Sequence, residues 1–170
     1  ITADPYMYVA VVSTAMGADA LNNPNPGPDL DAVSVTAGGR TVFADRVESS
    51  MMGEEGDREN TRTDFSAIVN GTDTLGNAAN ECNLDAQPGY TAIGGTGGYV
   101  VVSFGTTEIA SNDTVTVYEI NSENCTEAET ERPDTYEVYI TADATAARSP
   151  GTAADIRREW CLVGTQGGTG

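Results

Sequence analysis

The chain alternates between short apolar segments and clusters of residues that break secondary structure. Glycine, threonine, asparagine and aspartate recur at intervals of about 8–12 residues, and the segments between them are rich in valine and tyrosine. Such segments suit the pleated, half-buried surface of a β-sheet. In the clearest example, residues 114–120, Val115 and Val117 face one side and the threonines face the other. The pattern therefore predicts an all-β protein.

About eight segments carry this pattern, which in 170 residues is typical of a β-sandwich or jelly roll. We expect a single domain over residues 1–170 with strands at 6–14, 31–37, 40–48, 90–94, 99–105, 114–120, 135–142 and 159–164. Long acidic loops separate some of them, at 50–89 and 121–134. Short helical turns are expected at 64–69 and 153–158.

Two glycine-rich stretches carry structural predictions. Residues 94–98 lie between two expected strands and lack the Gly-Lys-Ser/Thr ending of a phosphate loop, so we expect a tight β-hairpin there. The tail at 164–170 is typical of a linker.

Trp160 is expected to pack in the core. The alternative is that its ring is a platform on which a sugar stacks.

The net charge and the lack of histidine limit the partners and the chemistry that we expect of this protein. The chain has 26 acidic residues against 8 basic ones, all arginine, and no histidine, which gives a formal net charge of −18. The electric field of such a negative chain repels nucleic acid and anionic membranes and attracts cations. The negative charge is compatible with a solvated surface suited to high salt and with specific divalent-cation sites. Without histidine, there is no Ser-His-Asp or Cys-His pair and no histidine zinc site, so we do not expect an enzyme.

Carboxylates at strand entrances are the candidate metal ligands. Asp29 and Asp31 are two residues apart, which places both on one face of an extended segment. Calcium takes 6–8 oxygen ligands, so such a pair makes half a site; the alternative is a pair of solvated loop acids. Asp113 and Glu119 are about 20 Å apart along a strand, so at most one of them joins the first pair. Asp85 is a further candidate from a loop.

The sequons favour an exported protein, and the cysteines could form one disulfide there. The three cysteines are Cys82, Cys125 and Cys161, and none has CxxC spacing. In an oxidising compartment one pair would bridge and one cysteine would remain, but the sequence does not choose the pair. Three sequons begin at Asn70, Asn112 and Asn124. No apolar run approaches the length of a transmembrane helix, so we expect an extracellular or cell-surface glycoprotein without membrane insertion.

Several segments together resemble one family. Residues 97–105, 112–119, 135–141 and 159–164 are similar to bacterial and archaeal cell-surface proteins that have a galactose-binding-like jelly-roll domain, often with a PEP-CTERM sorting signal. Residues 43–47 and 75–76 resemble the start of that domain, and residues 28–33 its closing strand. The resemblance implies a surface or matrix role and a structural calcium near the closing strand. It makes Asp31 the first candidate ligand, with Asp29 beside it, whereas the loop around Asp85 departs from the family.

The order of these segments departs from the family, because the closing strand comes near the front. A circular permutation would explain this order, and so would a cut within a longer repeat protein. A third explanation is that strands complete the sheet of a neighbouring copy, as in donor-strand complementation, with 1–20 as the candidate exchanged segment. Exchange between identical units gives a head-to-tail contact that does not close, and therefore a filament.

The sequence thus predicts a structural subunit of an extracellular homopolymeric filament or surface matrix, assembled by strand exchange and stiffened by calcium. Its partners would be identical subunits. The alternative is a secreted carbohydrate-binding module that binds glycans, which requires an exposed aromatic side chain near the acidic loops.

Overall fold

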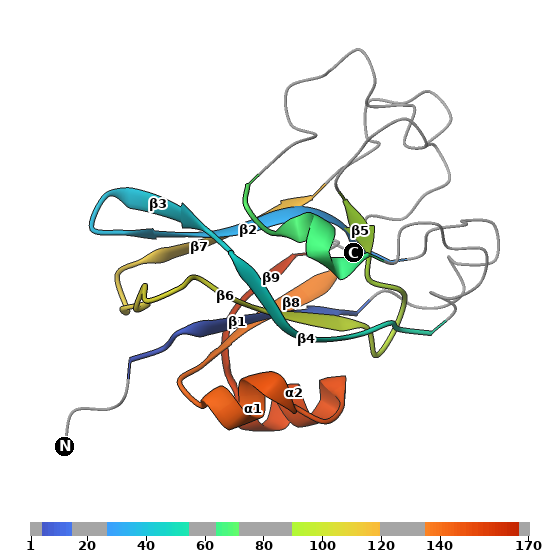
Figure 1. Ribbon diagram of the computed structural model, residues 1–170. Coiled ribbons are helices and arrows are strands. Elements are labelled where there is room, and N and C mark those ends of the chain that lie inside the picture. The colour runs from blue at the N-terminus through green and yellow to red at the C-terminus, as the bar shows by residue number, and fades with distance from the viewer. Residues whose placement is uncertain (1–4, 15–26, 55–63, 72–89, 120–134, 167–170) are drawn as a thin grey trace, which may run out of the picture.

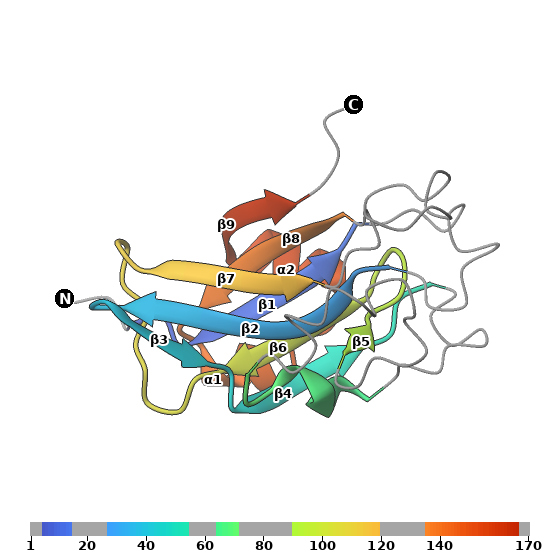
Figure 2. The ribbon, with the colours of Figure 1, turned by 90° about the horizontal axis from the view of Figure 1, so that it is seen from above.

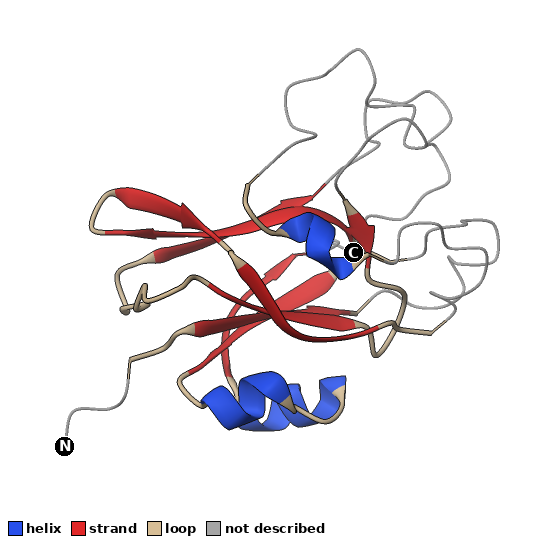
Figure 3. Cartoon of the chain, viewed as in Figure 1, coloured by secondary structure: helices blue, strands red, loops and turns tan. Residues whose placement is uncertain are grey.

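The protein is a β-sandwich with a helical layer on one outer face. A computed structural model describes residues 5–14, 27–54, 64–71, 90–119 and 135–166. Within these residues the chain forms two antiparallel sheets, and two short helices lie beneath one of them (Figure 1). Figure 3 shows the strands of both sheets in red and the helices in blue. The all-β sandwich predicted from the sequence is confirmed.

The larger sheet has five strands. Their order is β4 (Arg46–Met51), β6 (Tyr99–Ser103), β1 (Tyr8–Ser13), β8 (Tyr136–Thr141) and β9 (Cys161–Gln166). β1 is therefore central, between β6 and β8. β4 and β9 form the two edges, and each carries a β-bulge in its pairing with the next strand.

The smaller sheet is built around β2 (Asp29–Ala37). One edge of β2 pairs with β3 (Arg40–Phe43) and, nearer its start, with β5 (Thr91–Ala92). The other edge pairs with β7 (Thr114–Glu119). Figure 2 shows β7 and β9 at the same side of the sandwich.

Two hydrophobic clusters hold the layers together. Valines of both sheets fill the space between the sheets, among them Val9, Val11, Val33, Val35 and Val102. On the outer face of the larger sheet, a second cluster joins it to the helices α1 (Ala144–Arg148) and α2 (Ala153–Glu159). Trp160 packs in this second cluster, so its predicted place in the core is confirmed.

The sequence located most elements and missed some. The segment expected as one strand at 40–48 is two, β3 and β4, which lie in different sheets. The turn expected at 64–69 is a 3-10 helix, η2 (Phe65–Ile68), and the turn at 153–158 is α2. Helix α1 was not predicted. Among the described residues, no helix has the length and apolar character to cross a membrane.

The hairpin expected at 94–98 is wrong. β5 pairs with β2 and β6 pairs with β1 and β4, so residues 94–98 cross from one sheet to the other. The crossing is tightly packed against Gly53, whose amide donates to the Ile93 carbonyl at 3.0 Å. A Cβ on Gly98 would lie 2.0 Å from the Ile93 oxygen. The glycines therefore serve close backbone approach between the layers, and a two-residue hairpin turn is absent here.

Candidate functional site

The central strand β1 is the first candidate, because it is buried on both faces. Val9 and Val11 belong to the cluster between the sheets, and Ala10 and Val12 belong to the cluster under the helices. All four side chains have 0% exposure. β1 also pairs along both of its edges, with β6 and with β8. A sheet without β1 would separate into two pairs of strands with their apolar faces open to water.

Contacts at both ends of β1 fix its position. At the start, the Met7 amide donates to the Thr141 carbonyl at 3.2 Å. At the end, the Ser13 amide donates to the Gly98 carbonyl at 2.9 Å, and Arg157 Nη2 donates to the Ser13 carbonyl at 3.1 Å. Arg157 also pairs with Glu137 of β8 at 2.7 Å. Helix α2 therefore stabilises the junction between β1 and β8.

The acids at the start of β2 lie near the end of β1. Figure 2 places the end of β1 and the start of β2 at the same end of the sandwich. Asp29 and Asp31 are both buried, with exposures of 6% and 0%. The register between β2 and β7 shifts between Leu30 and Ala32, which makes Asp31 the bulged residue. Both aspartates take part in polar or electrostatic interactions.

Of the two acids flanking β7, the structure brings one toward this pair. Glu119 pairs with Leu30, the residue between Asp29 and Asp31. Burial raises the pKa of the Tyr136 hydroxyl, and the Glu119 carboxylate nearby raises it further. Asp113 lies at the opposite end of β7, where its carboxylate accepts from the Ala110 amide at 2.8 Å and closes a turn.

The positions of these acidic residues decide how much of a calcium site the described part of the chain contains. Two buried carboxylates on one bulged strand supply oxygen ligands of the kind that a hard cation takes. Within the described residues, however, no group of three acidic, histidine or cysteine side chains is placed to hold a metal ion. Asp85 lies outside the described residues. The described carboxylates supply part of a ligand set, and calcium remains a prediction.

The remaining candidate residues are divided between exposed positions and undescribed ones. Asn70 and Asn112 are exposed, as glycosylation requires. Cys161 is an exposed free thiol whose Sγ lies 3.3 Å from the Tyr6 hydroxyl. Asn124, Cys82 and Cys125 lie outside the described residues.

Aromatic side chains give little support to glycan binding. Trp160, Tyr136 and Tyr139 are buried, with exposures of 7%, 6% and 4%. Tyr118 is half-buried and packs on Phe43, with ring centroids 5.6 Å apart. In the described part of the chain, none of these rings offers an open face of the kind that stacks on sugars.

Sequence reasoning missed a groove on the open side of the sandwich. Its cavity of about 590 Å³ lies between β7 on one sheet and β8 and β9 on the other. Val115, Val117, Val138 and Ile140 line it, together with Val163 at its rim. β9 extends the larger sheet past β8, and no described strand of the smaller sheet lies beside β7 on that side. Alternation within β7 could have indicated an apolar face, but it could not indicate that no described strand lies beside β7 on that side.

Comparison of the chain with known protein families, with curated proteins and with solved structures gives no match in any of the three. The resemblance to cell-surface proteins therefore stays a prediction from the sequence.

Proposed function

We propose that the protein is a structural subunit of an extracellular homopolymer in which β1 of one copy completes the larger sheet of the next. The supporting observation is the position of β1, which is central in its sheet and fully buried between two apolar clusters. An exchanged β1 makes the same contacts in a neighbour as in its own chain. The polymer would therefore be held together by the same burial that holds β1 within a single chain.

The length of the connection from β1 to β2 limits how far an exchanged β1 can extend from its own chain. β1 ends at Ser13 and β2 begins at Asp29. A fully extended chain spans at most about 3.3–3.6 Å per residue, so this connection covers about 50 Å. A compact domain of this size is about 40 Å across. Prolines at positions 24, 26 and 28 favour extended backbone, which suits a bridge between adjacent copies.

The net negative charge of each copy explains why assembly would require cations. Copies that each carry a net charge of −18 repel one another, and salt or divalent cations reduce that repulsion. Asp29 and Asp31 lie beside the connection that must bridge two copies. Calcium bound there would stiffen the bridge, although exchange of β1 does not depend on it.

Electron microscopy tests the polymer and the calcium separately. Purified protein is concentrated in calcium, in magnesium and in chelator, and is imaged by negative stain. Filaments in calcium that become shorter or more flexible in chelator support both parts of the proposal. Filaments that do not respond to chelator would contradict the role of calcium. Monodisperse particles under all three conditions would contradict the proposed polymer.

A further inference from the structure

The outer edge of β9 has the properties of a self-association surface. β9 is the last strand of the larger sheet, and no described strand pairs with its outer edge. Leu162 and Val163 are exposed by 54% and 48%. The third large exposed hydrophobic side chain among the described residues, Met51, lies at the opposite edge of the same sheet.

The charge pattern of β9 is unusual for this chain. Its six residues include no acidic or basic side chain, although the chain has 26 acids. The other edge strands longer than two residues, β3, β4 and β7, each carry at least one charge. Natural edge strands are normally protected by charges, prolines or bulges against pairing with other chains. The bulge at Val163 is the one such device in β9.

The identity of the partner follows from electrostatics. A basic partner would be attracted to the acidic surfaces of the chain and not to an uncharged strand. A second copy is repelled by those same surfaces, so it tolerates contact only where charge is absent. β9 is such a place, and its exposed Leu162 and Val163 offer apolar area to an identical strand.

We propose that β9 pairs edge to edge with β9 of a second copy, in antiparallel orientation about a two-fold axis. The pairing joins the two larger sheets into one and covers Leu162 and Val163. It also brings the partner strand to the rim of the groove beside β7, which Val163, Gly164 and Thr165 line. The contact is independent of β1 and would join filaments side by side if β1 builds them.

One strand pair is a small interface. It buries less than the ~1,200 Å² of a standard stable complex, so the contact is weak and reversible between single copies. Contacts repeated along a polymer would act together and become strong. The measurement therefore needs high protein concentration, and added salt to screen the net charge.

Sedimentation velocity tests the contact on protein refolded at low concentration and isolated as a monomer. The monomer is concentrated to about 0.5 mM in 0.5 M sodium chloride and then diluted. Edge pairing reverses promptly on dilution, whereas an exchanged β1 returns only through unfolding. A β9 dimer and a β1-exchanged oligomer are thereby distinguished, and each proposal fails independently of the other.

Matched substitutions locate the contact. Leu162→Lys places a charge on β9, and Met51→Lys adds the same charge at the opposite edge of the sheet. The dissociation constant of the reversible dimer should rise at least about tenfold in Leu162→Lys and stay unchanged or fall in Met51→Lys. Thr165→Lys, at an exposed polar position of β9, repeats the test without removing an apolar side chain. A wild-type protein that stays monomeric, or equal effects at both edges, overturns the proposal.

Discussion

Val9 and Ala10 are consecutive residues of β1, yet both are fully buried, because Val9 faces the smaller sheet and Ala10 faces the helices. A strand covered on one face only would leave one of them in water. β1 therefore contributes to both hydrophobic clusters at once. This dual role is why its exchange between copies would link folding to assembly.

The apolar face of β1 toward the sandwich should be sensitive to truncation. Val11→Ala removes two methyl groups from a fully buried position and leaves a cavity. We expect the free energy of unfolding to fall by about 2 kcal/mol in urea titrations. Val163→Ala, at a half-exposed position, should change it by less than about 0.5 kcal/mol. Equal effects at the two positions would contradict the placement of β1.

The glycine-rich crossing should not accept a side chain. Gly98→Ala places a Cβ 2.0 Å from the Ile93 oxygen, so the backbone must shift. The expected loss is about 1–3 kcal/mol of unfolding free energy, measured by thermal or urea denaturation. Gly164→Ala is the control, because no atom outside its neighbouring residues lies within 4 Å of the added Cβ. A Gly98→Ala protein as stable as the wild type would rule out the close approach.

The ion pair between Arg157 and Glu137 should stabilise the end of β1. Both side chains are about one-third exposed or less, and Arg157 also donates to the Ser13 carbonyl. Arg157→Met should lower the free energy of unfolding by about 1–2 kcal/mol, less so in high salt. Arg158→Met, at a more exposed arginine one position along, should have a much smaller effect. The reverse order would exclude a role for α2 at this junction.

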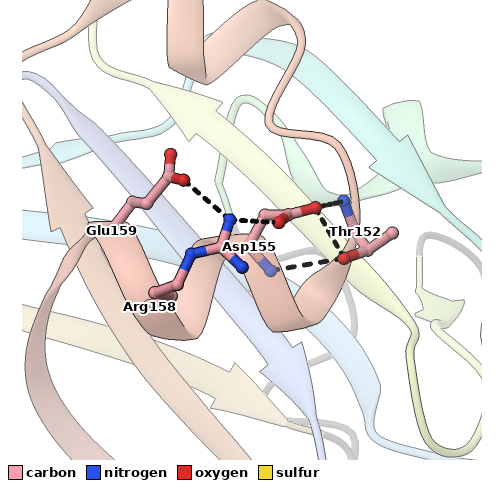
Figure 4. A network of polar contacts seen from close by, with 4 residues as sticks. All are labelled: Thr152, Asp155, Arg158 and Glu159. Carbon is pink, nitrogen blue, oxygen red and sulfur yellow. Dashed lines mark hydrogen bonds and ion pairs between the residues drawn. The ribbon is translucent and has the colours of Figure 1, made fainter.

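The capping box of α2 should respond to acid (Figure 4). The Thr152 hydroxyl and amide donate to the Asp155 carboxylate, and Arg158 donates as well, so the pKa of Asp155 lies below its ordinary value of 3.8. The resulting stability is fully present above pH 3.8 and is lost as the pH falls through the lower, folded-state pKa. In Thr152→Ala, the pKa of Asp155 should move up toward its ordinary value in a carboxyl NMR titration. An unchanged pKa would contradict the cap.

Strand positions could be predicted from the sequence because they depend on local alternation. Val115 and Val117 alternate with threonines, and both valines pack against the cluster between the sheets. The pairing of strands is a long-range property, which local alternation does not specify. Residues 94–98 were therefore interpreted as a hairpin although β5 and β6 belong to different sheets.

The candidate site, like the fold, could be predicted only where it depends on local sequence. The rise per residue along a strand correctly separated Asp113 from Glu119, and it indicated that at most one of them reaches Asp29 and Asp31. The bulge at Asp31 was not predictable, because a bulge depends on the register between two strands. The burial of β1 on both faces was not recognised either, since helices on the outer face of the sheet were not expected.

Cross-linking of β1 to β6 tests the central claim most directly. Ala10 and Val101 are direct partners in the ladder between these strands, so Ala10→Cys and Val101→Cys would form a disulfide across it. The three native cysteines are replaced by serine, and Ala10→Cys alone is the control. Strand exchange predicts a ladder of covalent multimers on non-reducing gels of oxidised, assembled protein. A single oxidised band at the mass of one chain would contradict it.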